Sequence, residues 1–237
     1  DVPYSYICEL KYDGVAISIT YKDGKLLKAI TRGDGTQGED VTNNVRTISS
    51  IPLVLSGDYP KNLEVRGEIM YSKLAFKELN QNRENEGLPL FSNPRNSASG
   101  TLKLQDSSIV AKRKLDCFLY SVFLDDGRIN KVFEQYKYLG NFGFKTPSIS
   151  KRYLETVKDV DGIMSFITYW EEKRNNLPFE IDGIVIKINE TDVQKEIGNT
   201  SKSPRWAIAY KYKAIQVSTV LEEFVYQVGR TGAITPV

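Results

Sequence analysis

The chain has 237 residues, two cysteines, no histidine and a net charge of +2, and its 41% hydrophobic content is ordinary for a globular protein. Without histidine it can form neither a Ser-His-Asp triad nor a histidine-ligated metal site, while Cys8 and Cys117 are too few for a tetrahedral zinc site or a secreted disulfide framework. The small net charge means that binding to phosphate or nucleic acid would depend on local clusters of cations.

The ends of the sequence and its hydropathy indicate the setting. No apolar run reaches 18 residues and no basic-then-apolar signal segment begins the sequence, so neither a membrane span nor a secretion signal is expected. The low cysteine count favours a reducing, intracellular setting. The sequence begins at Asp1 without a methionine and stops at Val237 in mid-pattern, and we therefore expect a piece of a longer protein.

The first third of the chain has the pattern of antiparallel strands. Apolar and polar residues alternate along three expected strands, at residues 4–11, 15–21 and 26–32. The turn residues at 22–25 predict a hairpin between the last two strands. A glycine-rich loop at 33–38 then precedes a short expected helix at 39–49.

The rest of the chain mixes helices with strands. Further strands are expected at residues 62–71, 115–124, 179–188, 205–213 and 217–228. Helices are expected at 72–85 with Ser72 as N-cap, at 130–142 and at 159–174, with short helical stretches after the loop 86–96 and between 188 and 205. Strands in hairpins with irregularly inserted helices favour an α+β fold with antiparallel sheets over a doubly wound parallel fold.

The glycine-rich loop Gly33–Gly38 (GDGTQG) matches the G-x-G-x-x-G pattern of dinucleotide-binding turns. A hairpin precedes it, however, and no βαβ unit follows it. Asp34 would also put a carboxylate where a pyrophosphate should lie. We therefore interpret this segment as a tight loop that positions Arg32.

Charged side chains lie opposite the apolar stripe on four of the expected strands. In the first strand, the alternation leaves Glu9 and Lys11 together on the face that points away from the core. The residues placed opposite the core in this way are Glu9, Lys11, Glu64, Arg66, Glu68, Lys187 and Lys211. In the strand at 205–213, Ile208 and Tyr210 are expected to face the core. A solvated sheet face gives the same pattern, so it allows a charged cleft without identifying one.

A protein without histidine needs another nucleophile for covalent catalysis, and lysine is the simplest choice. A lysine with its ordinary pKa of about 10.4 is almost fully protonated at pH 7, so the surroundings must lower that pKa. Lys11, which lies at a strand end and is followed by Asp13 and Gly14, is the best-placed candidate.

Six motifs make the pattern specific. In chain order they are Glu9–Gly14 (ELKYDG), Thr31–Gly35 (TRGDG), Glu64–Glu68 (EVRGE), Asn93–Asn96 (NPRN), Ile181–Lys187 (IDGIVIK) and Pro204–Lys211 (PRWAIAYK). The first resembles the K-x-D-G signature of covalent nucleotidyltransferases, which include DNA ligases, RNA ligases and mRNA capping enzymes. Together the six motifs resemble, over essentially the whole chain, the adenylation domain of bacterial NAD-dependent DNA ligases.

The resemblance implies a covalent nucleotidyltransferase (ATP-grasp-like) fold, with antiparallel β-sheets flanked by helices and a nucleotide cleft between the sheets. It implies an adenylation domain at residues 1–215. At residues 216–237 it implies a linker and the first strands of a truncated oligonucleotide-binding (OB) fold.

The resemblance also implies a reaction in three steps. Lys11 attacks the adenylyl phosphorus of NAD, releases nicotinamide mononucleotide (NMN) and becomes AMP-lysine. The AMP then passes to the 5′-phosphate of a DNA nick, and the 3′-hydroxyl displaces it to seal the strand. The implied cofactors are NAD and Mg²⁺ or Mn²⁺, with zinc held by a downstream domain absent from this chain. The implied partner is nicked double-stranded DNA, and a cytoplasmic monomer without membrane contact is expected.

The family's functional residues carry over to this sequence position by position. Lys11 is the implied nucleophile, and Asp13 is a catalytic neighbour that orients the site. The implied nucleotide-binding residues are Glu9 for the adenine amino group, Arg32 for the ribose or the nick, Glu68 for the ribose, and Lys187 and Lys211 for the α-phosphate. The implied phosphate or DNA contacts are Arg66, Arg95, Lys103 and Arg174. Asp182 is implied to help hold a hydrated magnesium ion.

The sequence departs from the family pattern at a few positions. Lys103 stands where the family usually has arginine, which replaces a bidentate phosphate contact by a point charge. The NMN-binding module is expected upstream of residue 1, so we expect this chain to bind AMP, to react poorly with NAD and not to seal nicks. Two alternatives stay open: an ATP-dependent ligase or RNA-capping type of nucleotidyltransferase, and a nucleotide-binding module without catalysis.

Overall fold

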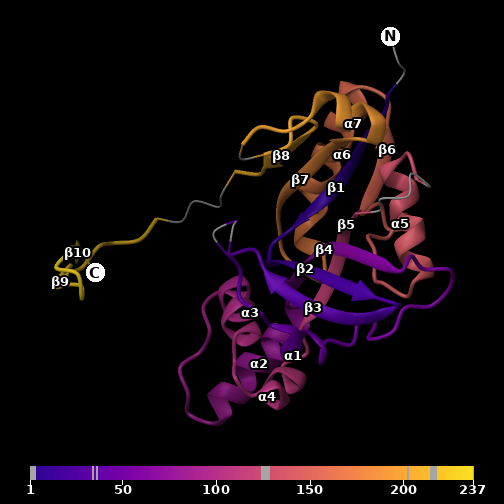
Figure 1. Cartoon of the computed structure of the whole chain (residues 1–237). Helices are drawn as coiled ribbons and strands as arrows, with labels where there is room; N and C mark the ends of the chain where they lie inside the picture. The colour runs from indigo at the N-terminus through magenta and orange to yellow at the C-terminus, as the bar shows by residue number, and fades with distance from the viewer. Residues whose placement is uncertain are drawn as a thin grey trace.

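Two four-stranded antiparallel sheets form the framework of the protein (Figure 1). The computed structural model describes residues 4–33, 35, 37–123, 129–201, 203–213 and 218–236. In spatial order, the first sheet consists of β6 (Leu154–Val157), β1 (Tyr6–Tyr12), β7 (Ile181–Ile188) and β8 (Ala207–Lys211). The second sheet consists of β3 (Lys25–Thr31), β2 (Val15–Lys22), β4 (Asn62–Met70) and β5 (Asp116–Phe123). The expected α+β fold with antiparallel sheets is confirmed.

A tight hairpin joins β2 to β3. Asp23 and Gly24 have positive φ angles of 49° and 73°, which is the backbone conformation that a two-residue hairpin turn requires. Gly24 is also packed against Tyr59, because a Cβ atom on it would lie 2.4 Å from the tyrosine ring. The hairpin predicted from residues 22–25 therefore forms, and its turn needs glycine for two reasons.

Helices cover the outer sides of both sheets. They are α1 (Thr42–Val45), α2 (Lys73–Asn85), α3 (Pro94–Leu102), α4 (Ser107–Lys112), α5 (Val132–Asn141), α6 (Val160–Lys173), the 3-10 helix η1 (Arg174–Asn176) and α7 (Thr191–Ile197). Helices α1 to α4 gather beside the second sheet, whereas α6 and α7 lie beside the first (Figure 1). Ser72 caps α2 as expected, since its side chain accepts a hydrogen bond from the backbone N–H of Ala75 at 3.1 Å.

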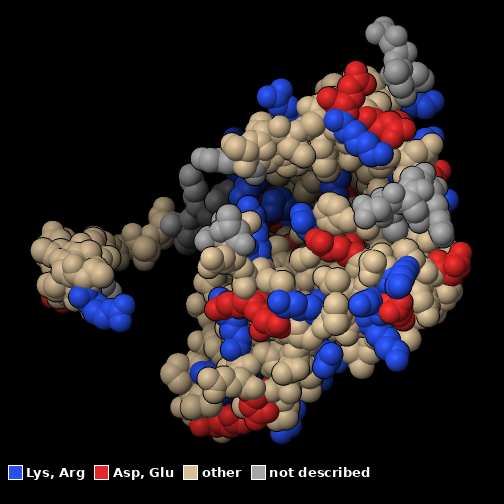
Figure 2. Space-filling model, viewed as in Figure 1, with Lys and Arg blue, Asp and Glu red and all other residues tan. Residues whose placement is uncertain are grey.

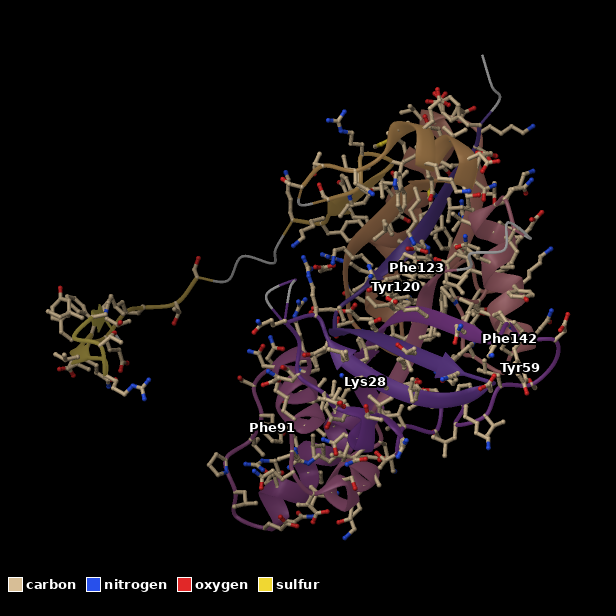
Figure 3. All side chains as sticks on the ribbon, in the orientation of Figure 1. Lys28, Tyr59, Phe91, Tyr120, Phe123 and Phe142 are labelled. Atoms are coloured by element: carbon tan, nitrogen blue, oxygen red, sulfur yellow. The ribbon has the colours of Figure 1, made fainter. Side chains whose placement is uncertain are left out.

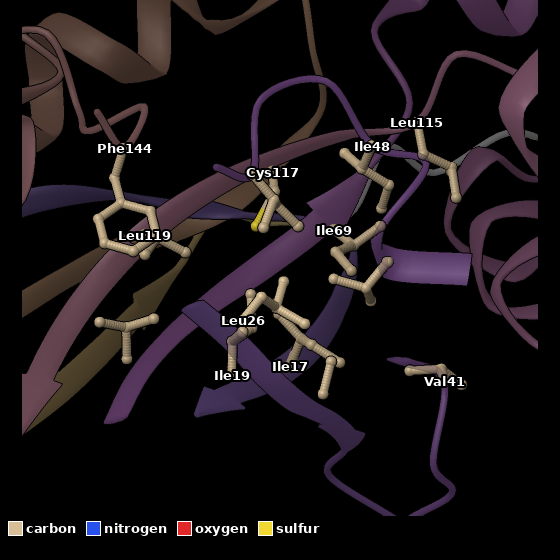
Figure 4. Packing of buried hydrophobic residues seen from close by; sticks show 14 of the residues in the cluster. Ile17, Ile19, Leu26, Val41, Ile48, Ile69, Leu115, Cys117, Leu119 and Phe144 are labelled. Atoms are coloured by element: carbon tan, nitrogen blue, oxygen red, sulfur yellow. The ribbon is translucent and has the colours of Figure 1, made fainter. Parts of the chain in front are cut away.

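Three clusters of buried apolar side chains hold the described elements together. The largest lies between the second sheet and its helices, and includes the fully buried Ile19 and Ile69 (Figure 4). The second lies between the first sheet and α6, and includes Trp170. Met70 and Phe118 belong to strands of the second sheet but pack in this second cluster, so the two sheets share a core where they meet. The third cluster consists of Ile7, Val132, Tyr136 and Leu154.

The last described segment contains a short exposed hairpin. Strand β9 (Tyr226–Val228) pairs with β10 (Ile234–Pro236), and every residue from 218 to 236 is exposed. Figure 1 shows this hairpin apart from the two sheets. The strand expected at 217–228 is therefore shorter than predicted, and its first residue lies outside the described residues.

One expected helix and one expected core face are wrong, and one strand was missed. The helix expected at 39–49 shrinks to the four residues of α1, because residues 39–41 instead bond to the edge of β3. In β8, Ile208 and Tyr210 were both expected to face the core but are 68% and 38% exposed. The buried cluster on that side of the sheet reaches β7 but includes no described residue of the edge strand β8. Strand β6 was not expected, since four residues are too few for alternation to stand out. No helix among the described residues is long and apolar enough to cross a membrane.

Candidate functional site

The two sheets meet where the turn Asp13-Gly14 links β1 to β2. Figure 2 shows a hollow in the surface there, with basic and acidic side chains on its walls. Gly14 allows the close approach, because a Cβ atom on it would lie 2.4 Å from the carbonyl oxygen of Ile69 and 2.9 Å from Cγ of Glu68. The end of β1, which carries Lys11, therefore lies against the part of β4 that carries Glu68. We call this junction the cleft; the interacting charged groups Lys11, Glu68 and Asp182 belong to it.

Lys11 is one of two lysines that bracket a carboxylate in the cleft. Its ammonium nitrogen lies 3.2 Å from Oδ1 of Asp182, and the ammonium nitrogen of Lys211 lies 3.7 Å from Oδ2. Lys11 and Asp182 are about one quarter exposed, whereas Lys211 is two thirds exposed. The site thus offers a sheltered amine with a second cation at the open side of the cleft.

A β-bulge places Asp182 beside Lys11. In the register of β1 and β7, Lys11 lies opposite Gly183 while Tyr12 lies opposite Ile181. Asp182 is therefore the extra residue of the bulge, and a bulge redirects a side chain that regular alternation would send to the other face. This geometry explains why Ile181 is buried in the core although Asp182, its neighbour, reaches the cleft.

Glu9 and Lys187 form a buried ion pair on the same face of the first sheet as Lys11. Their charged atoms lie 2.5 Å apart, and the side chains are 4% and 11% exposed. Tyr136 of α5 donates a hydrogen bond to the other oxygen of Glu9. Lys187 also donates to the carbonyl oxygen of Tyr120 at 3.2 Å, and Figure 3 shows Tyr120 at the junction of the sheets. These hydrogen bonds give both charged groups of the ion pair further polar partners. Without such partners, the burial of the two charges would cost free energy.

Glu68 faces the charged groups of the cleft from β4. Burial raises the pKa of its carboxyl to about 7, and the nearby Asp13 and Asp182 add to the rise while Lys11 and Arg95 oppose it. Around neutral pH this carboxyl group therefore exists in both its protonated and its ionised form. It can donate or accept a hydrogen bond to a bound hydroxyl group.

Arg95 connects the helical side of the second sheet to the cleft. It lies at the start of α3, and its guanidinium donates to Oδ1 of Asp13 at 2.8 Å. The contact therefore joins α3, beside the second sheet, to the turn between β1 and β2. It fixes the carboxylate of Asp13 two residues after Lys11.

Arg66 and Lys103 lie outside this group of contacts. Arg66 shares the cleft-side face of β4 but pairs with Glu64 at 3.3 Å and stacks over the ring of Phe123 at 4.5 Å. Lys103 pairs with Glu39 at 2.5 Å. Both side chains are about half exposed. They are available to an external anion, but they do not meet Lys11.

Arg174 and Arg32 differ in their relation to the cleft. Arg174 lies 4.8 Å from the centre of the Tyr212 ring, and Tyr212 is buried against α6. It therefore lies on the helical side of the first sheet and is not brought to Lys11. Arg32 is exposed at the end of β3, where its backbone N–H donates to Ala16 at 3.2 Å. Of the loop expected to position it, Gly33–Gly38, two residues lie outside the described residues.

Sequence patterns did not single out Tyr136 and Tyr120. Both contacts depend on pairs far apart in the chain: 127 residues separate Tyr136 from Glu9, and 67 separate Lys187 from Tyr120. Tyr136 lies in an amphipathic helix, where a tyrosine at this spacing is typical of a core position. No local signal distinguishes it from such a position.

Asp182 is the carboxylate that fits a magnesium ion best. Among the described residues, no group of three or more acidic, histidine or cysteine side chains is arranged to hold a metal. Oδ1 of Asp182 is buried and, although the ammonium nitrogen of Lys11 lies 3.2 Å away, it accepts no well-aligned hydrogen bond from the described residues. Magnesium is commonly held by one or two carboxylates together with substrate phosphates and water. The site therefore fits magnesium bound jointly with a phosphate.

The fold defines the class of protein. A solved structure named Pmar-Lig_Pre. has a TM-score of 0.50 with 12% identity, over 100% of this chain and 52% of that one. A second, Pmar-Lig_PreS3, has a TM-score of 0.50 with 14% identity, over 88% of this chain and 43% of that one. At these identities the likeness concerns the fold alone. The expected covalent nucleotidyltransferase fold is confirmed.

The sequence then defines the family. The family described as NAD-dependent DNA ligase adenylation domain matches residues 1–215. The DNA ligase of Flavobacterium psychrophilum is 52% identical over 237 residues, which is 100% of this chain and 35% of the relative. The DNA ligase of Bacteroides fragilis is 50% identical over 235 residues, which is 99% of this chain and 35% of the relative. The chain therefore belongs to the NAD-dependent DNA ligase adenylation domain family, and it spans about a third of these relatives.

Proposed function

We propose that this chain is the adenylation module of an NAD-dependent DNA ligase, with Lys11 as the residue that carries AMP. The observation that supports the proposal most is the position of Lys11, which is sheltered in the cleft beside Asp182 and near a second lysine. Phosphoryl transfer needs a nucleophile, cations for the charge on the phosphate oxygens and oxygen atoms for metal and sugar. The cleft offers all of these groups.

In the proposed first step, Nζ of Lys11 attacks the adenylyl phosphorus of NAD. The ammonium group of Lys11 first loses one proton to give the free amine. A P–N bond then forms, the P–O bond to NMN breaks so that NMN leaves with its phosphate oxygen, and the nitrogen releases a second proton and keeps one hydrogen. Lys11 and Lys211 lie beside the two carboxylate oxygens of Asp182, at 3.2 and 3.7 Å, so both cations are close to the place where the phosphate would react. Magnesium bound at Asp182 would neutralise that carboxylate and the phosphate charge.

We assign Glu9 and Lys187 to the edge of the adenine ring. Lys187 pairs with Glu9 and not with Asp182, so this geometry favours the base over the α-phosphate contact expected for Lys187. A carboxylate accepts from the 6-amino group of adenine, and an ammonium group donates to N1. We then assign the α-phosphate contact to Lys211. We assign the contacts to the ribose hydroxyls to Glu68 and to Arg32.

We assign the outer cations to DNA. Arg66 and Lys103 form exposed ion pairs, which contribute little to stability and are easily exchanged for phosphate contacts. Arg95, paired with Asp13, is assigned to the 5′-phosphate side of the nick. Arg174 has no position in this proposal, because it packs on Tyr212.

The remaining steps belong to a longer protein. We propose that residues 1–215 form the adenylation domain and that 216–237 begin an OB-fold domain. In the whole protein, AMP would pass to the 5′-phosphate of nicked double-stranded DNA, with zinc bound in a downstream domain. The same proposal places the enzyme in the bacterial cytoplasm as a monomer.

Labelled nucleotides test the choice of NAD. The chain, extended upstream by the NMN-binding region, is incubated with NAD or with ATP labelled in the adenylyl group, and protein-bound label is measured. We expect label from NAD and none in Lys11→Arg, whose guanidinium stays protonated. Label from ATP but not from NAD would establish the ATP-dependent alternative. Label in neither case, with AMP still bound, would favour a binding module without catalysis.

A further inference from the structure

Tyr136 contacts Glu9 although it lies far from the sequence motifs of the cleft. Its ring is buried, and its hydroxyl donates to Oε2 of Glu9 while Lys187 bonds to Oε1. The hydroxyl also lies 3.0 Å from the carbonyl oxygen of Tyr120, but that oxygen already accepts from Lys187 at 3.2 Å, so we assign the single hydroxyl proton to Glu9. The ammonium nitrogen of Lys187 lies 3.4 Å from the Tyr136 hydroxyl oxygen. The three side chains therefore form a closed triangle, and each oxygen of the carboxylate has its own donor.

The start of α5 fixes the position of Tyr136. The backbone N–H of Val132 donates to the carbonyl oxygen of Asn189 at 2.8 Å, and that of Phe133 donates to its side-chain oxygen at 3.0 Å. Asn189 is 3% exposed and lies two residues after Lys187. The buried end of β7 thus fixes Lys187. Through the start of α5, it also fixes Tyr136, which lies one helical turn further along.

We propose that Tyr136 is a positioning residue that sets the purine specificity of the cleft by holding Glu9 as a fixed hydrogen-bond acceptor. The inference rests on the proposed adenine contact of Glu9. An ionised carboxylate accepts hydrogen bonds and donates none, and each oxygen has two lone pairs. One lone pair on each oxygen of Glu9 is already engaged. The remaining lone pairs therefore point in fixed directions. Burial and the charge of Glu9 raise the pKa of the Tyr136 hydroxyl, which keeps it a donor.

Hypoxanthine provides the informative comparison. It carries a carbonyl oxygen at position 6 where adenine carries an amino group, so a carboxylate held in place meets a second acceptor and is left without a bond. A carboxylate that is free to rotate could turn to the N1–H of hypoxanthine and recover one. Removal of the Tyr136 hydroxyl should therefore weaken the preference for AMP over IMP.

Calorimetric titration of the chain with AMP and with IMP tests this inference. The wild type is expected to prefer AMP, and Tyr136→Phe, which keeps the ring, is expected to lower the ratio of the two affinities by about three- to tenfold. Tyr138→Phe is the matched control on the same helix. Its hydroxyl donates to the carbonyl oxygen of Asp58 at 3.3 Å, so the ratio should not change.

A double-mutant cycle separates positioning from packing. In a Glu9→Gln background, Tyr136→Phe should change the ratio no further. An unchanged ratio in Tyr136→Phe, or the same loss in the Glu9→Gln background, would overturn the role of Tyr136. A wild type without preference for AMP would instead overturn the adenine contact and the proposed function with it. Should Tyr136→Phe not fold, the hydroxyl proton of Tyr136 in wild type gives a second readout by NMR: its resonance must shift in Glu9→Gln, and a fixed resonance would contradict the proposal.

Discussion

Glu68 shows how strongly the cleft alters a single residue. Its pKa of about 7 in the folded protein exceeds the ordinary value of 4.5. Between these values the folded state holds a proton that the unfolded state has lost, so the Glu68 contribution to stability falls as pH rises from about 4.5 to about 7. Each pKa unit corresponds to about 1.4 kcal/mol, which sets an upper limit of roughly 3 kcal/mol.

Urea unfolding of wild type and Glu68→Gln at both ends of this pH range measures that contribution. The amide cannot ionise, so we expect Glu68→Gln to gain stability relative to wild type as pH rises. Parallel pH dependences of the two proteins would show that the pKa of Glu68 is not raised.

Tyr12, next to Lys11, has a buried hydroxyl without a hydrogen-bond partner among the described residues. Its ring stacks on Phe118 at 4.6 Å between centres, so Tyr12→Phe keeps the packing. Because an unsatisfied buried polar group is unfavourable, we expect Tyr12→Phe to raise the free energy of unfolding by about 1 kcal/mol. Tyr212→Phe is the control, because its hydroxyl donates to the carbonyl oxygen of Ile167 at 3.0 Å. In denaturant unfolding, this variant should lose free energy of unfolding by a similar amount. A loss in both variants would contradict the assignment.

The positions of residues in local motifs could be predicted from the sequence. Contacts between residues that are far apart in the chain could not. Lys11 and Glu9 follow from the motif and from strand alternation. Their partners do not: alternation would have turned Asp182 away from Lys11, and the bulge that redirects it depends on how β1 and β7 pair. Arg174 carried a family position but packs on Tyr212.

At the scale of elements, the bulge and strand β8 form the wall of the cleft that carries Lys211. Gly183 allows β7 and β8 to approach, because a Cβ atom on it would lie 1.9 Å from the carbonyl oxygen of Tyr210. Gly183→Ala should therefore separate the strands, lower the free energy of unfolding by about 2 kcal/mol or more, and weaken AMP binding. Calorimetry and urea unfolding measure both effects.

Gly100→Ala is the matched control for Gly183→Ala. Gly100 lies within α3 with open space around its Cα, so alanine should raise the free energy of unfolding by about 0.5–1 kcal/mol and leave AMP binding unchanged. Equal effects of the two substitutions would mean that the close contact of β7 and β8 does not matter.

The elements themselves were predictable in proportion to their length and regularity. Strands β2 and β4 alternate over eight and nine residues, and both were expected. The segment 39–41 was wrongly expected to be helical. It bonds to the edge of β3, and backbone pairing of this kind produces no local sequence pattern that could have shown it. The exposure of Ile208 could not be read from alternation, since an edge strand with apolar residues on one face looks like an interior strand.

At the scale of the whole molecule, polar contacts link the helices beside the second sheet to the turn after β1 and to the residue before β7. These two points are adjacent, since the backbone N–H of Asp13 donates to the carbonyl oxygen of Glu180 at 3.1 Å. Arg95 bonds to Asp13 at 2.8 Å, and the ammonium nitrogen of Lys73 at the start of α2 lies 3.5 Å from the carboxylate of Glu180, just before β7. The shared core packs the two sheets together where they meet, and these contacts join the same region of the fold. Under the proposed function, the adenine contacts come from this chain, and we expect NMN binding and DNA sealing to need further regions of a longer protein.

A nick-sealing assay tests this division. The chain alone should bind AMP but leave nicked duplex DNA unsealed, whereas the protein extended to the full length of its relatives should seal it. Efficient sealing by the chain alone would contradict the division of labour.

A crystal structure of the upstream-extended protein after reaction with NAD tests the central claim most directly. We predict continuous density between Nζ of Lys11 and the phosphorus of AMP, with the adenine ring beside Glu9 and Lys187. AMP bonded to another residue, or an adenine ring bound away from Glu9, would contradict the account.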